Sequence, residues 1–443
     1  MKNFYRNFLK LCSMLVLQNV VTLSVNLADN IMLGAFSETA LSGVTTVNQV
    51  QFVFQQLLMA LGDGLVIFGS QYWGKKETQQ VRKISVWAMR TGLFIALILF
   101  ILASFFPRQL LGLFTTDQTI IEAGMSYLTI IRFTYFFFAI TQILLATLRC
   151  VEIAGIAFAL SVMTLVINCT INWILIYGHF GAPGMGAAGG TLTARIVEIC
   201  VLIIYISRKQ GWIGIRLKDY LKTDWEFGWK YYKVVCPLLV IQGLWGVNTA
   251  LQTVILGHMT AAAIAANSAA SNLFLMVKSA AVGAASAASV TMGKTIGSGD
   301  LDLAKLYSRK LQKLFVVMGL TCGVLLFFIR IPVLSLYQLS PETRNMANTF
   351  LIILSVVMVG MSYQMPTNGG IIRGSGSIAY SMKVDLISTW AIVIPLSMFM
   401  AFVVKASPAI VVCCLNADQI FKCVPAFLKC NYGHWIKTMT NIS

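Results

Sequence analysis

Long apolar runs without charged side chains recur along the whole 443-residue chain. A helix needs about 20 consecutive apolar residues to cross the roughly 30 Å hydrocarbon core of a bilayer. Only 11% of the residues are charged, against about a quarter in soluble domains, so the composition excludes an ordinary soluble protein. The sequence predicts an all-α membrane protein with twelve transmembrane helices, at 11–34, 44–70, 84–106, 120–146, 156–178, 186–207, 233–257, 262–292, 312–330, 345–370, 378–404 and 408–428.

The net charge of +17 marks membrane topology rather than nucleic-acid binding. Most Lys and Arg residues fall in the N-terminal tail and in alternate connections between the predicted spans. Cytoplasmic loops carry such an excess of basic residues. We therefore expect both termini in the cytoplasm, a multi-pass location in the bacterial inner membrane, a lipid bilayer as environment and no nucleic-acid partner.

The two halves of the chain resemble each other at one offset. Gly34 aligns with Gly257 and Gly74 with Gly297, which are both separations of 223 residues. Six spans per half is an even number, so both halves enter the bilayer in the same direction and the repeats are parallel. This predicts two lobes of six helices each, residues 1–207 and 233–443, joined by a cytoplasmic linker at 208–232.

Asp29 is the first candidate functional residue, because an Asp inside a span costs at least about 2.5 to 3.5 kcal/mol on insertion scales. It lies near the outer end of the first span, beside Asn26 and Asn30. No basic residue is within a helical turn of it in the sequence. Asp29 could alternate between cation-loaded and empty states, or it could be a near-surface carboxylate that faces outside water.

Other polar residues within the spans are weaker candidates. Asn168 and Asn172 are four residues apart, so they share a helix face and could complete an oxygen-rich pocket with Asp29 or hold helices together. Arg195 and Glu198 are three apart and resemble a self-neutralising pair, structural or coupling. Further candidates for substrate binding or coupling are Asn26, Asp63, Arg132, Lys278, Asp385 and Asp418.

Catalysis has no support in the sequence. The three histidines are far apart, and neither H-E-x-x-H nor G-x-S-x-G occurs. A membrane enzyme acting on lipid would need a convergent acid, base or metal set, which the sequence does not show. We therefore expect no enzyme activity and no cofactor.

Three stretches resemble the multidrug and toxic compound extrusion (MATE) transporters. Residues 26–34 are similar to the first helix of that family, and 70–77 to a cytoplasmic Gln-x-x-Gly-x-x-Asp type of turn. Residues 168–178 together with 183–189 are similar to the fifth and sixth helices. The likeness covers nearly the whole chain.

The resemblance implies a V-shaped pair of six-helix lobes that exports organic cations or amphiphilic compounds in exchange for Na⁺ or H⁺. It implies that Asp29 and Asn168 belong to a cation site in the N-terminal lobe and would bind the metal ion if the coupling ion is Na⁺. Asn172 stands where the family usually has Asp, and Met14 where it usually has Pro. The alternative function is a lipid or glycolipid flippase of the same superfamily. The protein is expected to be a monomer.

Overall fold

The computed structural model describes residues 2–36, 38–115, 117–177, 187–209, 211, 213, 219, 224–335 and 339–441. These residues form helices and turns, with no strand among them. The helices of the first half are α1 (Lys2–Phe36), α2 (Glu38–Gly74), α3 (Thr78–Phe105), α4 (Pro107–Gly112), α5 (Gln118–Ile131), α6 (Thr134–Cys150), α7 (Gly155–Tyr177) and α8 (Ala187–Lys209).

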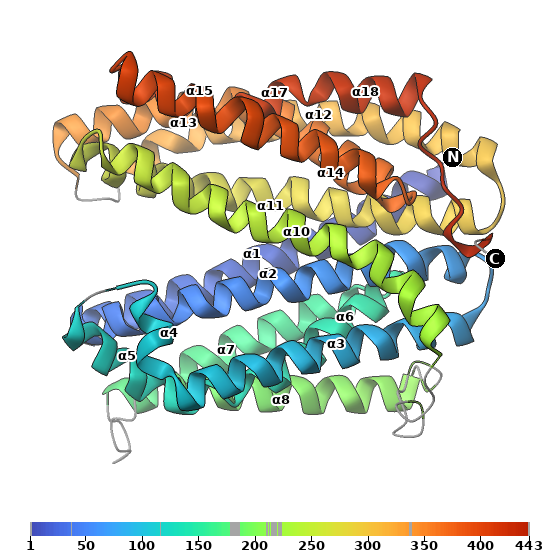
Figure 1. Cartoon of the computed structure of the whole chain (residues 1–443), viewed down its shortest axis with the longest axis horizontal. Helices are drawn as coiled ribbons and strands as arrows, with labels where there is room; N and C mark the ends of the chain where they lie inside the picture. Colours follow the sequence, from blue (N-terminus) through green and yellow to red (C-terminus); the bar gives the residue numbers. More distant parts are fainter. Residues whose placement is uncertain are drawn as a thin grey trace. The chain divides into compact units, whose positions relative to one another are not determined.

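The second half is helical in the same way (Figure 1). Its helices are α10 (Trp225–Gly257), α11 (Ala261–Gly297), α12 (Leu301–Leu334), α13 (Pro341–Met365), η2 (Pro366–Ile372), α14 (Ile378–Leu386), η3 (Ile387–Val393), α15 (Ile394–Met398), η4 (Phe399–Val403), α16 (Pro408–Asn416), α17 (Asp418–Phe421), α18 (Cys423–Tyr432) and η5 (Met439–Asn441).

The described residues contain eleven helices that are long and apolar enough to cross a membrane, and the number is twelve when a bent pair of helices is counted as one span. The bent pair is α5 and α6, which meet at an angle of 58°. The prediction of a single helix over 120–146 was therefore wrong in detail, because the chain turns at Arg132 and Phe133. The last predicted span is present as Pro408–Tyr432, with Asp418 and Lys422 buried inside it.

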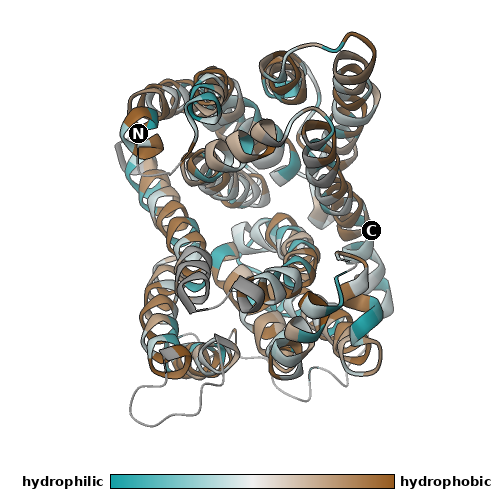
Figure 2. Cartoon of the chain, turned by 90° about the vertical axis from the view of Figure 1, so that its left-hand side faces the viewer, coloured by the Kyte–Doolittle hydropathy of each residue, from teal (hydrophilic) through white to brown (hydrophobic). Residues whose placement is uncertain are grey.

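The outer faces of the long helices are apolar. On α12, Val317 and Phe328 are more than half exposed, at 60% and 68%, and Ile331 follows at 64%. Figure 2 shows brown, apolar residues along most of the helical ribbon and teal, hydrophilic residues in short stretches. An apolar surface of this extent suits contact with lipid, where a helix satisfies its own backbone hydrogen bonds.

The chain folds into two compact units. The N-unit comprises Leu17–Gly69 and Glu77–Val235, and the C-unit comprises Met1–Val16, Ser70–Lys76 and Cys236–Ser443. The helices α1, α2 and α10 thus each contribute to both units. The lobe boundaries predicted from the sequence stay a prediction, and residues 210, 212, 214–218 and 220–223 of the expected linker lie outside the described part of the chain.

Two repeat-equivalent glycines make a matched pair of close contacts inside the C-unit. A Cβ atom added to Gly74 would lie 2.1 Å from the backbone oxygen of Lys294, and one added to Gly297 would lie 1.9 Å from that of Gln71. The offset of 223 residues that relates Gly74 to Gly297 also relates Gln71 to Lys294. Glycine lets the two helix ends approach this closely, as small residues do elsewhere in membrane helix packing.

The side chain of Gln71 holds the C-terminal tail. Its Nε2 donates to the backbone oxygen of Lys437 at 3.1 Å, and its Oε1 accepts from the backbone N–H of Met439 at 2.7 Å. Ser375 adds a bond from its hydroxyl to the backbone oxygen of Trp435 at 2.7 Å. The Gln-x-x-Gly stretch at 71–74 therefore has a structural role, because its Gln fixes the tail and its Gly permits the helix crossing.

Gly297→Val is expected to destabilise the protein, because the added atoms would overlap the backbone at Gln71. Overpacking of this kind reduces the free energy of unfolding by about 1 to 3 kcal/mol. The measurement is the thermal unfolding of purified protein in detergent.

Gly243→Val is the matched control, because Gly243 also lies within a helix and a Cβ added there would have nothing within 4 Å. Both variants place a β-branched residue in a helix, so that penalty is common to them. Equal loss of stability in the two variants would contradict the close-contact explanation.

Candidate cation site

Three of the polar residues predicted in the N-terminal half, Asp29, Asn168 and Asn172, meet between α1 and α7, next to α8. The side-chain amide of Asn172 donates from Nδ2 to Asp29 Oδ1 at 2.7 Å and to Asn168 Oδ1 at 3.0 Å. The amide of Asn168 in turn lies 3.4 Å from the hydroxyl of Thr191 on α8. Asn168 and Asn172 are almost completely buried, whereas Asp29 is partly exposed. Residues 143 positions apart in the sequence thus form one hydrogen-bonded chain.

An oxygen atom without a partner lies in this chain. Asn172 Oδ1 is buried and accepts no hydrogen bond from the described residues. It faces Gly190 on α8, where an added Cβ would lie only 2.1 Å away. A buried carbonyl oxygen without a donor is costly unless a cation or water binds to it. Together with the Asp29 carboxylate, it gives the site oxygen ligands of the kind that hard cations prefer.

Arg195 and Glu198 form the ion pair that their spacing predicted. The guanidinium NH1 lies 2.7 Å from Glu198 Oε2, and its carbon lies 4.7 Å from the centre of the Phe138 ring. Glu198 is only 4% exposed, so the pair neutralises a charge that would otherwise be costly to bury. Arg195 also interacts electrostatically with Asp29. Arg195 thus adds a positive charge to the electrostatic surroundings of the Asp29 carboxylate, while its ion pair is with Glu198.

The remaining predicted residues lie elsewhere. Asp63 on α2 is 3.8 Å from Arg149 at the end of α6, so it belongs to a separate ion pair in the N-unit. Asp385 is in α14 of the C-unit. The side chain of Asn26 lies outside the described residues. The Asp29 chain of hydrogen bonds is therefore assembled from Asp29, Asn168 and Asn172 of the predicted set.

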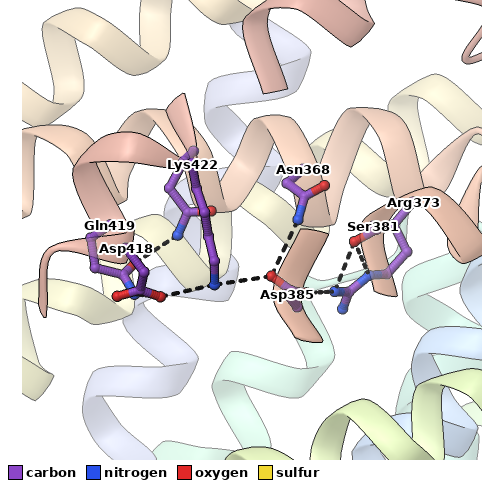
Figure 3. A network of polar contacts seen from close by, with 8 residues as sticks. Asn368, Arg373, Ser381, Asp385, Asp418, Gln419 and Lys422 are labelled. Atoms are coloured by element: carbon purple, nitrogen blue, oxygen red, sulfur yellow. Dashed lines mark hydrogen bonds and ion pairs between the residues drawn. The ribbon is translucent and has the colours of Figure 1, made fainter. Parts of the chain in front are cut away.

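A second polar network lies in the C-unit, and the sequence prediction contained two of its members, Asp385 and Asp418 (Figure 3). Asp385 accepts from Arg373 at 3.0 Å and from Lys422 at 3.2 Å. Lys422 also lies 2.8 Å from Asp418. Asp418 and Lys422 are four residues apart with opposite charges, a spacing that could have indicated their pairing. No local pattern connects them to Asp385 or Arg373.

The sequence prediction also missed Thr191 and Gly190. Both lie at the start of α8, in a stretch of small uncharged residues that gives no sign of a functional site in the sequence. Their importance comes from the helix that they face, because Asn168 bonds to the Thr191 hydroxyl and Asn172 fits against Gly190.

The family model MatE matches residues 15–174 and 237–399, which is most of the chain and both repeats. The protein belongs to the MATE family. Its members are membrane transporters, and the matched residues include the α1 and α7 segments that supply Asp29, Asn168 and Asn172. The expected membership and the all-helical twelve-span fold are confirmed.

Curated relatives of this MATE protein are distant but cover most of its length. The probable multidrug resistance protein NorM of Bacillus cereus is 22% identical over 383 residues, which span 84% of this chain and 83% of that protein. The protein of the same name from Listeria monocytogenes is 23% identical over 407 residues, covering 90% and 88%.

Solved MATE structures have the same fold. The Vibrio cholerae MATE transporter VcmN in its bent form superimposes with a TM-score of 0.86 at 16% sequence identity, covering 98% of this chain and 97% of that one. A MATE structure in complex with MaL6 gives a TM-score of 0.85 at 18% identity, covering 96% and 95%. At these identities the comparison establishes the fold alone.

Gly190→Ala is expected to displace the Asn172 amide, because the added methyl group would overlap Oδ1. Asp29 would then lose its 2.7 Å hydrogen bond. A hydrogen bond to a charged group contributes about 1.5 to 3 kcal/mol, so we expect the free energy of unfolding to fall by a similar amount. Thermal unfolding of the purified protein measures it.

Gly189→Ala is the neighbouring control. Its added Cβ would meet the terminal methyl of Leu175 at 2.7 Å, and a flexible side-chain end can move aside. If Gly189→Ala lost as much stability as Gly190→Ala, the packing against Asn172 would not explain the effect.

Proposed function

We propose that this MATE protein is a secondary active exporter that exchanges organic cations or amphiphilic compounds for Na⁺ or H⁺. The supporting observation is the hydrogen-bonded chain Asp29–Asn172–Asn168, which joins a carboxylate to a buried oxygen atom that accepts no hydrogen bond from the described residues. The printed names of the curated relatives, probable multidrug resistance proteins, point in the same direction.

The ligands suit a small monovalent cation. Asp29 supplies the negative charge, and the side-chain carbonyl oxygens of Asn168 and Asn172 supply uncharged oxygen ligands for Na⁺. With H⁺ as the coupling ion, the proton would bind to Asp29 itself, and the Asn172 amide would keep the carboxyl in place. Asn172 in place of a second carboxylate leaves the site with a single acidic group, so one positive charge is enough to neutralise it.

Electrostatic interactions at Asp29 differ between the cation-free and the cation-bound state of the site. When Asp29 carries no cation, its carboxylate is stabilised by the hydrogen bond from the Asn172 amide and by the electrostatic interaction with Arg195. Binding of an outside cation would neutralise Asp29 and weaken these interactions, which favours a different arrangement of α1 against α7. The helix α1 is continuous through Met14, so this proposal needs no proline kink in it.

The membrane potential can drive the exchange. One positive charge that enters the cytoplasm across 100 mV releases about 2.3 kcal/mol, enough for about 40-fold accumulation of a neutral substrate. We also propose that the protein needs no cofactor, acts as a monomer in a bacterial inner membrane and has both termini in the cytoplasm.

Asp29→Asn is expected to abolish gradient-driven transport, because the substitution removes the carboxylate that supplies the negative charge of the site. The assay is uptake of a fluorescent organic cation into inside-out proteoliposomes, with Na⁺ and pH gradients imposed separately. We expect a loss of at least about tenfold relative to the native chain, since even one 1.4 kcal/mol interaction corresponds to that factor. The gradient that drives native transport identifies the coupling ion.

Asp302→Asn is the control, since this carboxylate is exposed at the start of α12 and pairs, within the described part of the chain, with the exposed Lys305 at 3.4 Å. It should transport as the native chain does. Folded native protein that moves none of several dyes under either gradient would contradict the exporter. Lipid scrambling assays would then test the flippase alternative.

A further inference from the structure

A lysine ammonium lies between two carboxylates in the C-unit. Lys422 Nζ is 3.2 Å from Asp385 Oδ1 and 2.8 Å from Asp418 Oδ2. The side chains of Lys422 and Asp418 are 6% and 8% exposed, and that of Asp385 is 24% exposed. The three residues belong to the last two membrane spans, which approach each other at this point (Figure 3). A positive charge is thus held by oxygen atoms within the span region.

Asn368 completes the surroundings of this charge. Its Nδ2 donates to Asp385 Oδ1 at 3.4 Å, the same oxygen that Lys422 contacts. The residue is 3% exposed, and its Oδ1 accepts no hydrogen bond from the described residues. Asn368 lies in the π-helical segment η2, and short π-helical segments within α-helices frequently occur at functional sites. The amide therefore presents a hydrogen-bond donor to the cluster and helps to hold the Asp385 carboxylate in place.

Other charged groups face the cluster from neighbouring helices. Arg373 pairs with Oδ2 of Asp385, the oxygen that Lys422 does not contact, at 3.0 Å. Lys278 on α11 interacts electrostatically with Asp418, and its ammonium lies 5.2 Å from the centre of the Trp245 ring. Among the described residues, Lys422 is the one cation within 4.0 Å of the Asp418 carboxylate. The cluster thus depends on Lys422 for direct neutralisation of Asp418.

We infer that the carboxylates of Asp385 and Asp418, the first held by the Asn368 amide, form a second monovalent-cation site, which the native protein fills with the ammonium group of its own Lys422. A Lys ammonium is a compact point charge. Like a free alkylammonium or an alkali cation, it is stabilised by several surrounding oxygen atoms. Exchange of the tethered ammonium for a free cation conserves the charge of the cluster. The class of ligand is therefore Na⁺ or a small primary ammonium ion.

The tethered cation has a consequence for transport, which rests on the proposed exporter function. While Lys422 occupies this site, the C-unit takes up no exchangeable cation there. Cation exchange at Asp29 in the N-unit then supplies the coupling. The site in the C-unit becomes available to a free cation only when the Lys422 side chain is removed or moves away.

The test removes the tether and supplies a free cation. Lys422→Ala is made in an Asp29→Asn background, so that the N-unit site does not contribute. Melting temperatures of the purified full-length chain are measured in methylammonium chloride, NaCl and N-methyl-D-glucamine chloride at equal ionic strength. We expect methylammonium or Na⁺ to raise the melting temperature of Lys422→Ala saturably by about 3 °C or more over the bulky cation.

Two controls decide the assignment. The Asp29→Asn background with Lys422 intact should melt at the same temperature in all three salts, since its site is filled. Adding Asp385→Asn to Lys422→Ala should abolish the cation-specific rise. Identical melting of Lys422→Ala in all salts would overturn the inference and leave Lys422 as a structural partner only.

Lys422→Met, which keeps the length of the side chain, is measured alongside in case the alanine variant does not fold. Recovery of folded protein only when methylammonium or Na⁺ is present during purification supports the site. Failure of both variants to fold in every salt overturns it, because a free cation should replace the missing ammonium. These measurements use binding and stability alone, so they stand apart from the transport assay of the proposed function.

Discussion

A charge inside a membrane-spanning segment has little water to solvate it, so it needs a partner on its own helix or a neighbouring one. This constraint organises the polar interior of both units. Asp63 pairs with Arg149, Glu198 with Arg195, and Asp385 with Arg373. Asp29 differs from these carboxylates, because its 2.7 Å hydrogen bond comes from the neutral amide of Asn172 and not from a cationic side chain. A carboxylate without a directly bound cationic side chain can accept a mobile cation, whereas the paired carboxylates are already neutralised.

Duplication explains how the chain is held together at one end of the C-unit. The repeat places a glycine at equivalent positions in both halves, and each glycine lies against the backbone of the other half at positions 71 and 294. One duplicated residue type thus produces two related contacts. The same stretch supplies Gln71, whose amide fixes the C-terminal tail. A sequence motif that resembles a family signature is therefore explained here by packing and hydrogen bonding.

Spacing along one helix allowed some polar contacts to be predicted. Asn168 and Asn172 bond to each other, and Arg195 bonds to Glu198, as separations of four and three residues on a helix indicate. The contact between Asp29 and Asn172 was only a suggestion, because it joins different helices. Thr191, Gly190 and the partners of Asp385 were not predicted. Their roles depend on which side chains the neighbouring helices present, and no local pattern records that.

The sequence by itself determined the class of structure. Apolar runs long enough to cross a bilayer must become helices, since only a helix satisfies the backbone of a single segment in lipid, and their duplication set the number of spans. Only the tertiary structure decided which polar residues act together. It bent the fourth span between Ile131 and Thr134, inserted the π-helical segment that carries Asn368, and placed Lys422 between two carboxylates. These outcomes arise from helix packing, where distances between side chains are fixed by neighbours far away in the sequence.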